Sequence, residues 1–446
     1  MSAKVRTRFA PSPTGPLHIG GLRTALYSFA LAKHDAGDFI LRIEDTDKKR
    51  EVPGSREKIE ELLKLFGLNW DEHYVQSERA KEGVYKKATE KLISQGQAFY
   101  CDCKARNAKE EGFSKELRDP CRDKGKKEGA IKLKVPEDET ITFKDFVLGK
   151  KVSWNSSEVS DTTILKSDGF PTYHLAVVVD DNEMGITHAL RGHDWMPSTP
   201  IHILVYKYLG YPLPEIGHLT DILDPEGGKL SKRKGSTSVE ALLEEGYLPE
   251  AILNFVMLLG WAPKDNKELF SLEEFVKVFD PEGLQQSNPV FNRDKLDWFN
   301  GHYIRKMPDS ELANMVMPFA PKGASKDEII SIVSLVKDRI RKLSDFSSLA
   351  VGYFEDPPLL PELESAEHKK HLEAAAHALE NVDKWEKALI DSALMEVIEK
   401  NDFNTGDFFM SLRMAQFGSR TTPPVNDSLL IFGKEKTLRS IRKYLK

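Results

Sequence analysis

The chain has 446 residues, of which 40% are hydrophobic, and it carries a formal net charge of −6. Its length predicts roughly two to four domains, and its negative charge excludes a uniformly basic nucleic-acid-binding protein, so any surface for nucleic acid must be local. The sequence has no apolar run of roughly 18 residues, no apolar segment behind its basic start, and only three cysteines. We therefore expect a soluble, cytoplasmic protein with no membrane partner and no disulfide framework.

The first 75 residues alternate between strand and helix patterns. Val5 to Ala10 suits a short strand, apolar residues at helical spacing indicate a helix from Gly21 to Ala36, and residues 39–43 suit a buried strand. Gly37 follows the helix, as is typical of a helix end. This alternation predicts an α/β fold with a parallel sheet, whose ligands bind at the carboxyl ends of the strands.

The pattern changes from about residue 76 to residue 182. A charged helix over 80–97 and strand-like stretches over 130–135 and 140–146 indicate an insertion between two halves of the nucleotide-binding fold, which resumes near Met184. The insertion therefore separates two segments that are expected to share one sheet.

The second half of the chain is predicted to be helical. Residues 236–315 have a helix-compatible apolar pattern, and the chain becomes almost wholly helical after Met307-Pro308. Ser325-Lys326-Asp327-Glu328 is typical of a capping box and precedes one apolar helix face. No β-barrel pattern occurs in this half.

Two short segments indicate phosphate chemistry. His18 lies beside Gly20 and Gly21, where a backbone can approach a nucleotide, and Lys229 and Lys232 form a glycine-flanked cluster that can clamp phosphates. Neither the P-loop pattern nor a dinucleotide-binding G-x-G-x-x-G after a strand occurs. Alone, each segment could be a hydrogen-bonded turn histidine or a solvated basic loop. Together they suggest ATP chemistry.

The two segments resemble the HIGH and KMSKS signatures of class I aminoacyl-tRNA synthetases, here His18-Ile19-Gly20-Gly21 and Lys229-Leu230-Ser231-Lys232-Arg233. Residues 6–15, 41–47 and 166–176 resemble the bacterial type of the glutamyl-tRNA synthetase family, and the resemblance covers nearly the whole chain. It implies that glutamate and ATP form glutamyl-adenylate, with Mg²⁺ accompanying the pyrophosphate, and that the glutamyl group is then transferred to tRNA.

The resemblance also implies the domain organisation. A Rossmann-like catalytic domain would be followed by helical domains and interrupted by an insertion that holds the tRNA acceptor end. The expected boundaries are 1–75 and 183–235 for the catalytic domain, 76–182 for the insertion, 236–315 for a helical stem-contact domain and 316–446 for a helical anticodon-binding domain.

The same resemblance implies roles for individual residues. The catalytic residues would be His18, Lys229 and Lys232. The ATP-binding residues would be Thr14, His18, Gly20, Asp194, Lys229, Ser231 and Lys232, and the glutamate-binding residues would be Arg8, Ser12, Glu44, Tyr173 and Arg191. Arginines suit carboxylates, and a carboxylate such as that of Glu44 suits the substrate ammonium.

Alternatives remain open for this glutamate site. Tyr173 could be a packed core aromatic, and Arg8 or Arg42 could be structural ion-pair partners. Val177 stands where many relatives have Asn, which leaves that contact to water, to a neighbour such as His174, or to a different placement of the substrate side chain.

Cys101, Cys103 and Cys121 provide three quarters of a zinc site. Zinc-bearing relatives have a fourth ligand shortly after the third cysteine, and here Asp123 lies two residues after it. Two interpretations stay open. Either a structural Zn²⁺ binds the three cysteines with Asp123 or another ligand, or the site has decayed.

The end of the chain is locally basic. Cations from Lys434 to Lys446, with Arg413 and Arg420 upstream, suit the phosphates of tRNA, but they also suit a solvated helix whose C-terminal dipole favours positive charge. The expected partners are L-glutamate, ATP, tRNA(Glu) and, as an open alternative, tRNA(Gln). We expect a monomer.

Three other functions are less consistent with the sequence. A shortened relative that glutamylates a modified tRNA base lacks the C-terminal third, and a glutaminyl-tRNA synthetase would end in β-barrels. A non-catalytic paralogue that only binds tRNA or a partner would not need the two signature segments. The sequence leaves open whether the enzyme charges tRNA for glutamate, for glutamine or for both, and whether glutamate activation needs tRNA.

Overall fold

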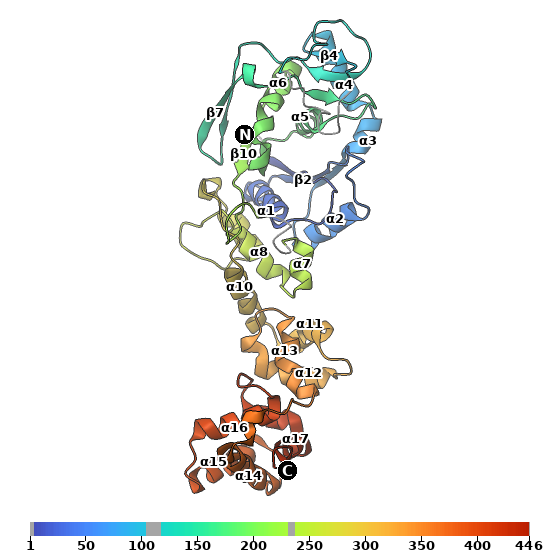
Figure 1. Cartoon of the computed structure of the whole chain (residues 1–446). Coiled ribbons are helices and arrows are strands. Elements are labelled where there is room, and N and C mark those ends of the chain that lie inside the picture. The colour runs from blue at the N-terminus through green and yellow to red at the C-terminus, as the bar shows by residue number, and fades with distance from the viewer. Residues whose placement is uncertain (1–3, 104–116, 231–236, 446) are drawn as a thin grey trace. The chain divides into compact units, whose positions relative to one another are not determined.

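The computed structural model describes residues 4–103, 117–230 and 237–445. The predicted ATP-binding residues Ser231 and Lys232 lie outside these ranges. The chain divides into two compact units: the first comprises Met1–Leu242 and Ile252–Arg293, and the second comprises Leu243–Ala251 and Asp294–Lys446. Figure 1 shows strands packed with helices in the first unit and helices in the second.

The first unit begins with the predicted alternation of strand and helix. A parallel sheet has the order β1-β2-β3, and the two long crossovers carry helices, as parallel pairing requires. The strands are β1 (Arg6–Phe9), β2 (Asp38–Ile43) and β3 (Glu72–Val75), and the helices are α1 (Ile19–His34) and α2 (Ser55–Leu65).

Helix α1 begins and ends two residues earlier than the sequence predicts. It begins after His18, which has an extended backbone and whose ring nitrogen accepts a hydrogen bond from Gly20 N. It ends before Ala36, which has a φ of +52°. A Cβ at Gly37 would lie 2.0 Å from Val5 O, so only glycine allows the chain to turn back into the sheet here.

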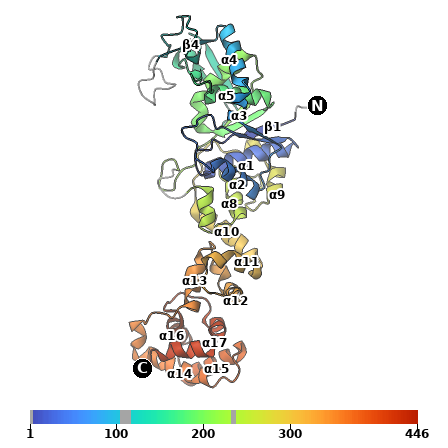
Figure 2. The same ribbon diagram turned by 90° about the vertical axis from the view of Figure 1, so that its right-hand side faces the viewer.

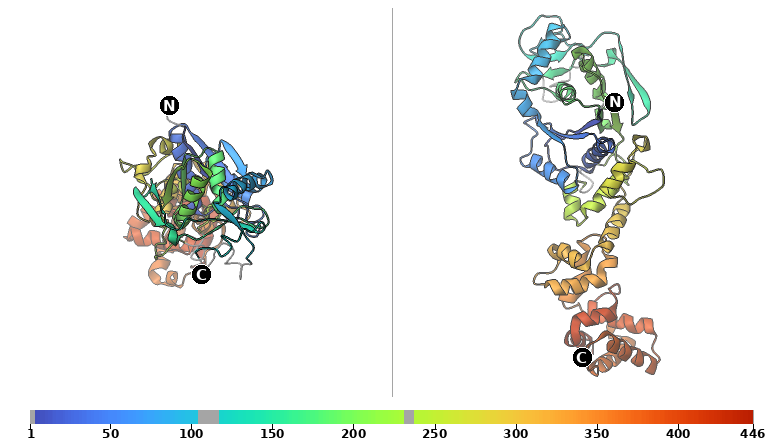
Figure 3. Two further views of the ribbon diagram at one scale, coloured as in Figure 1. Left: turned by 90° about the horizontal axis from the view of Figure 1, so that it is seen from above. Right: turned by 180° about the vertical axis from the view of Figure 1, so that it is seen from behind.

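A second sheet has the order β7-β6-β10-β9. Strand β10 pairs in parallel with β6 on one side and with β9 on the other, and β6 and β7 form an antiparallel hairpin, seen from behind in Figure 3. Thr187 N donates to Arg6 O (2.9 Å), so β9 adjoins β1 of the first sheet. The elements are β6 (Thr140–Asp145), β7 (Lys150–Asn155), β9 (His188–Gly192), α6 (Thr199–Leu209) and β10 (Glu215–Leu219).

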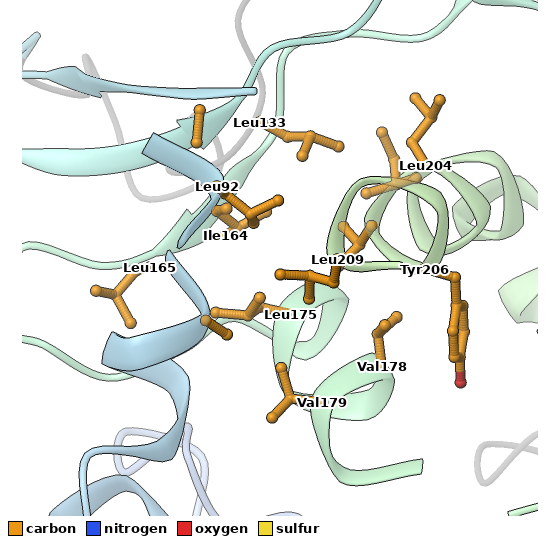
Figure 4. Packing of buried hydrophobic residues seen from close by; sticks show 14 of the residues in the cluster. Leu92, Leu133, Ile164, Leu165, Leu175, Val178, Val179, Leu204, Tyr206 and Leu209 are labelled. Carbon is orange, nitrogen blue, oxygen red and sulfur yellow. The ribbon is translucent and has the colours of Figure 1, made fainter. Parts of the chain in front are cut away.

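An antiparallel sheet of order β4-β5-β8 packs with four helices around the hydrophobic core shown in Figure 4. The predicted single helix over 80–97 is in fact two helices, because Gly83 has a φ of +78° and interrupts the helical backbone. The elements are α3 (Gln76–Lys81), α4 (Val84–Ser94), β4 (Ala98–Cys101), β5 (Ala130–Leu133), β8 (Thr163–Leu165) and α5 (Tyr173–Glu183).

The chain then becomes helical. The next four helices after residue 237 are α7 (Val239–Glu244), α8 (Pro249–Met257), α9 (Leu272–Val278) and α10 (Arg293–Lys306). Helix α9 begins with a capping box of Ser271 and Glu274, and its Phe275 packs 6.3 Å from Tyr27 of α1, measured between ring centroids. This contact fixes α9 on the nucleotide-binding fold.

The second unit contains helices and no strand in its described part, and Figure 2 shows its helices from α11 onward in orange and red. The capping box predicted at Ser325 is confirmed: its Oγ accepts from Glu328 N and the Glu328 carboxylate accepts from Ser325 N. The longer helices are α11 (Asp309–Val316), α12 (Lys326–Val336), α13 (Asp345–Phe354), α14 (Ala366–Glu380), α15 (Lys387–Lys400), α16 (Thr405–Phe417) and α17 (Val425–Arg442).

Short 3₁₀ helices connect several of these elements. They are η1 (Ser156–Glu158), η2 (His193–Ser198), η3 (Pro281–Gly283), η4 (Met317–Phe319), η5 (Lys337–Arg339) and η6 (Pro361–Glu364). No helix in the described part of the chain combines the length and apolar character needed to cross a membrane.

Candidate nucleotide and amino-acid site

His18 lies at the N-terminus of α1, directly after the carboxyl end of β1 and its loop. Its Nδ1 accepts from Gly20 N (3.3 Å), so its ring proton lies on Nε2, which contacts Thr237 Oγ1 at 2.7 Å. Thr237 O accepts from Ile19 N (3.1 Å), so the residues after the lysine loop are held against the His18 turn. Sequence reasoning did not identify Thr237, because nothing in a single sequence pairs it with His18.

The turn around His18 is open to a ligand. Thr14 and Ser12 are exposed, and a Cβ at Gly20 would meet no atom closer than 3.6 Å, so Gly20 leaves space beside the first N–H groups of α1. Gly21 has a different role, because a Cβ there would lie 2.9 Å from Leu17. The positive end of the helix dipole makes this end of α1 suited to anions, although the first N–H groups of the helix already donate within the protein.

Lys229 is held by two carboxylates. Its Nζ lies 2.5 Å from Asp194 and 3.0 Å from Asp221. Burial lowers the pKa of Lys229, but the hydrogen bonds to these two carboxylates outweigh it and the pKa is raised overall. The ammonium is therefore charged, and its contacts with the two carboxylates compete with any contact to a phosphate.

Arg8 on β1 is buried and ion-paired. Its Nε lies 3.1 Å from the Asp181 carboxylate, and its Nη1 donates to Leu190 O (3.0 Å). Asp181 also accepts from Arg42 Nη1 (2.6 Å). Both arginines are thus ion-pair partners, which was one of the interpretations that the sequence left open.

Glu44 follows β2 and is buried beside Arg42, whose Nη2 lies 3.1 Å away. Burial raises the pKa of Glu44 to about 7, although Arg42 and Arg8 act in the opposite direction. Near neutral pH both the charged and the neutral form of this carboxyl group are therefore populated. A nearby ammonium ion would favour the charged form.

Arg191 on β9 differs from the other buried arginines in its partners. No ion pair to Arg191 occurs within the described ranges. Its guanidinium instead donates to neutral side chains: to His218 Nε2 (3.0 Å), His202 Nδ1 (2.9 Å), Thr199 Oγ1 (2.8 Å) and Tyr173 Oη (3.4 Å). Arg191 therefore presents a positive charge that a substrate carboxylate can neutralise.

Tyr173 begins α5 and is both packed and hydrogen-bonded. Its ring lies 4.1 Å from that of Trp195 and 5.3 Å from that of His202, between centroids, while its hydroxyl contacts Arg191. The packing and the polar contact are thus compatible, so the two sequence interpretations do not exclude each other.

A small cavity of about 10 Å³, enough for one water molecule, lies between Arg8 and Arg191. Val177 and His202 also line it. His202 lies between this cavity and His174, whose Nδ1 is 3.3 Å from His202 Nε2. His202, and not His174, therefore lines the cavity together with Val177, but both of its ring nitrogens are already hydrogen-bonded, to Arg191 and to His174.

Comparison of the chain with known protein families agrees with this geometry. Residues 4–298 match the family described as "tRNA synthetases class I (E and Q), catalytic domain", and residues 311–445 match "Anticodon binding domain". The chain belongs to this class I synthetase family.

Relatives of this synthetase share its whole length. It is 39% identical to a glutamate–tRNA ligase of Dehalococcoides mccartyi, over 99% of this chain and 97% of that protein, and 37% identical to one of Finegoldia magna, over 99% of each. It is also 34% identical to the solved structures of a glutamate tRNA ligase from Elizabethkingia meningosepticum in complex with its amino acid (TM-score 0.84) and a glutamate-tRNA synthetase from Elizabethkingia anophelis (TM-score 0.85), with 99% of each chain covered in both cases.

The three cysteines of the synthetase come together with a carboxylate. Cys103 Sγ lies 3.3 Å from Cys121 Sγ, and Cys101 Sγ lies 3.5 Å from Asp119 Oδ2; the four ligand atoms all lie within 4.8 Å of one another. Three thiolates and one carboxylate suit the four-coordinate geometry of zinc. The residues present therefore fit this metal.

The fourth member of this cluster differs from the residue named from the sequence. Asp123 is exposed and its carboxylate accepts from Lys134 Nζ (2.9 Å). A turn closed by Lys124 N and Cys121 O (3.1 Å) leads the chain away from the cluster directly after the third cysteine. The carboxylate beside the three cysteines is that of Asp119, two residues before the third cysteine, and not that of Asp123.

The C-terminal cations are bonded within the second unit. Lys436 Nζ donates to Tyr353 O (2.7 Å), and carboxylates of Glu380 and Asp356 pair with Arg442 and Lys443. Upstream, Arg420 pairs with Glu362. These contacts use the basic side chains to hold helices together, so they do not by themselves indicate a tRNA surface.

Proposed function

We propose that this synthetase activates L-glutamate with ATP to form glutamyl-adenylate and pyrophosphate, and then transfers the glutamyl group to the terminal ribose of tRNA. The observation that carries the proposal is Arg191, a buried guanidinium whose hydrogen-bond partners among the described residues are all neutral. A buried positive charge without an ionic partner is costly, and a carboxylate substrate removes that cost. Glutamate, unlike glutamine, brings a side-chain carboxylate.

The other side chains assigned to glutamate suit the rest of the molecule. Arg8 shares the cavity with Arg191, but Asp181 already neutralises much of its charge, so Arg191 supplies the stronger field. Glu44 accepts the substrate ammonium and becomes fully charged in doing so. Tyr173 and Ser12 add hydrogen bonds at the two ends of the substrate.

ATP binds along the turn that precedes α1. Thr14, Gly20 and His18 contact the phosphates, and Asp194 and Lys229 complete the site. Ser231 and Lys232, which lie outside the described ranges, are assigned to ATP from the sequence alone. Adenylate formation is an in-line displacement at the α-phosphorus, for which positioning and charge stabilisation are the main requirements. Lys229 exchanges its carboxylate partners for the pyrophosphate, whose charge Mg²⁺ also neutralises when it is bound.

The tRNA extends over the remaining domains. The insertion at 76–182 binds the acceptor end, 236–315 the stem and 316–446 the anticodon, and the matched anticodon-binding family supports the last assignment. We propose tRNA(Glu) as the substrate, a monomer as the working form and the cytoplasm, where translation takes place, as the location. Charging of tRNA(Gln) is the alternative outcome of the test below.

A structural zinc ion completes the insertion. Cys101, Cys103 and Cys121 would hold it as thiolates, with Asp119 as the fourth ligand. Lys132 Nζ lies 2.6 Å from the same carboxylate and would keep it ionised. Bound zinc supplies cross-linking of the insertion and takes no part in the reaction.

Pyrophosphate exchange and tRNA charging test the proposal together. With saturating tRNA, exchange should depend on glutamate and not on glutamine, and labelled glutamate should become attached to purified tRNA(Glu). Arg191→Ala should abolish saturation by glutamate, whereas Arg118→Lys, which alters an arginine that donates to Pro136 O and Ser156 O in the insertion, serves as the matched control. Binding of tRNA without any exchange would instead identify a non-catalytic paralogue.

A further inference from the structure

Three neighbouring strands bring a carboxylate, an imidazole and Arg191 into one line. Asp145 is the last residue of β6, His218 lies on β10 and Arg191 lies on β9, directly opposite His218 in the strand register. The side chains of Asp145 and His218 are fully buried. A Cβ at Gly217 would lie 2.6 Å from Phe146, so a glycine beside His218 is what allows the turn after β6 to approach.

The hydrogen bonds in this line determine the state of His218. Asp145 Oδ2 lies 2.6 Å from His218 Nδ1, while Asp145 Oδ1 accepts from Val147 N and Leu148 N (3.0 Å each). A carboxylate accepts hydrogen bonds, so the ring proton lies on Nδ1. His218 Nε2 then has a lone pair directed at Arg191 Nε, 3.0 Å away.

The hydrogen-bonded chain from Asp145 through His218 orients Arg191 without neutralising its positive charge. Burial lowers the pKa of His218, which agrees with a neutral ring between the carboxylate and the guanidinium. A carboxylate in direct contact would pair with Arg191, as Asp181 does with Arg8. An intervening imidazole supplies a fixed acceptor instead, and the guanidinium keeps its positive charge for a ligand.

We propose that Asp145 and His218 are positioning residues for glutamate binding, in which Asp145 holds the His218 tautomer that accepts from Arg191. This inference rests on the proposed function, because it takes Arg191 as the guanidinium that binds a glutamate carboxylate. Neither residue touches the substrate. Their effect is therefore on the affinity for glutamate, transmitted through the direction of one side chain.

Three variants of the full-length protein test the proposal by glutamate-dependent pyrophosphate exchange with saturating tRNA. Asp145→Asn places an amide N–H opposite His218 Nδ1, which reverses the tautomer and sets a donor against the Arg191 donor. Loss of the charge-assisted hydrogen bond from Arg191 to His218 should raise the KM for glutamate about 10-fold or more. The KM for ATP should stay within about two-fold of the wild-type value. His218→Gln keeps an acceptor oxygen at the Nε2 position and should retain most of the glutamate affinity, whereas His218→Asn is too short and should lose it.

Two controls separate positioning from folding and from the proposed function. Asp161→Asn changes another fully buried carboxylate, which accepts from Asp119 N and Val135 N, and should leave the KM for glutamate unchanged. In the His218→Gln background, Asp145→Asn should add little, because no tautomer remains to be held. If Asp145→Asn does not fold, the comparison of Gln with Asn at residue 218 decides the same question.

The outcomes are distinguishable. A wild-type protein with no glutamate-dependent exchange would overturn the proposed function itself. If exchange occurs and Arg191→Ala raises the KM for glutamate, but Asp145→Asn does not, or Gln and Asn at residue 218 behave alike, the positioning role is wrong. Equal rises in the KM for ATP and for glutamate would likewise show a general structural defect in place of a specific role.

Discussion

Glu44 allows the sharpest prediction, because its burial has opposite consequences for stability and for binding. The rise of its pKa from 4.5 to about 7 corresponds to about 3 kcal/mol in favour of the neutral form in the folded protein. Because the pKa of Glu44 is higher in the folded than in the unfolded protein, its contribution to the free energy of unfolding is complete below pH 4.5. This contribution is lost as the pH rises through 7. Glu44→Gln should therefore raise the free energy of unfolding at pH 8, by up to about 3 kcal/mol.

Binding of glutamate should respond in the opposite sense. If the charged carboxylate receives the substrate ammonium, the KM for glutamate should rise about 10-fold as the pH falls from 8 to 6, since the fraction of ionised Glu44 falls by that factor around a pKa of 7. His174, which contacts His202 behind Arg191, has a pKa lowered to about 4 by burial, so it does not titrate in this interval.

The assay is glutamate-dependent pyrophosphate exchange from pH 5.5 to 8.5, with denaturant unfolding of the same samples. Glu44→Gln should show a high KM with no pH dependence and an increased stability at pH 8. A wild-type KM that is constant across this range, or a Glu44→Gln variant with wild-type affinity, would refute the assignment of Glu44 to the ammonium.

Three further predictions follow from the other parts of the site. Lys232→Ala should lower the rate of adenylate formation far more than it weakens glutamate binding, since the developing pyrophosphate charge needs it most; a variant changed only in KM would contradict this role. The purified protein should contain close to one Zn²⁺ per chain by metal analysis, and Asp119→Ala should reduce that content while Asp123→Ala should not. Truncation at about residue 320 should preserve the exchange reaction but impair tRNA charging, so a folded truncated protein that charges tRNA normally would exclude the anticodon-binding assignment.

Local patterns in the sequence predicted much of the fold. The strands near Arg6 and Phe39, the capping box at Ser325 and the helical second half depend on short-range preferences, and each is confirmed within a few residues. The split between α3 and α4 was not predicted although Gly83 is visible in the sequence, because charged, helix-favouring residues lie on both sides of this left-handed position.

Strand order was not predictable from the sequence, and it decides what surrounds the candidate glutamate site. Asp145 belongs to a segment interpreted as an insertion, yet β6 pairs with β10 and places Asp145 beside His218. Similarly, the direction of one turn decides whether Asp119 or Asp123 lies beside the three cysteines. Single-sequence reasoning finds residues with suitable chemistry, but the partners of those residues come from tertiary contacts.

The most direct test of the account is the amino acid that becomes attached to tRNA. Wild-type protein and Arg191→Ala should each be incubated with ATP, tRNA(Glu) or tRNA(Gln), and labelled glutamate or glutamine. We expect the wild type to attach glutamate to tRNA(Glu) and to attach no glutamine. Arg191→Ala should lose at least about 100-fold in kcat/KM for glutamate, since the substrate carboxylate loses its cationic partner. Attachment of glutamine, or an Arg191→Ala variant as active as the wild type, would contradict this expectation.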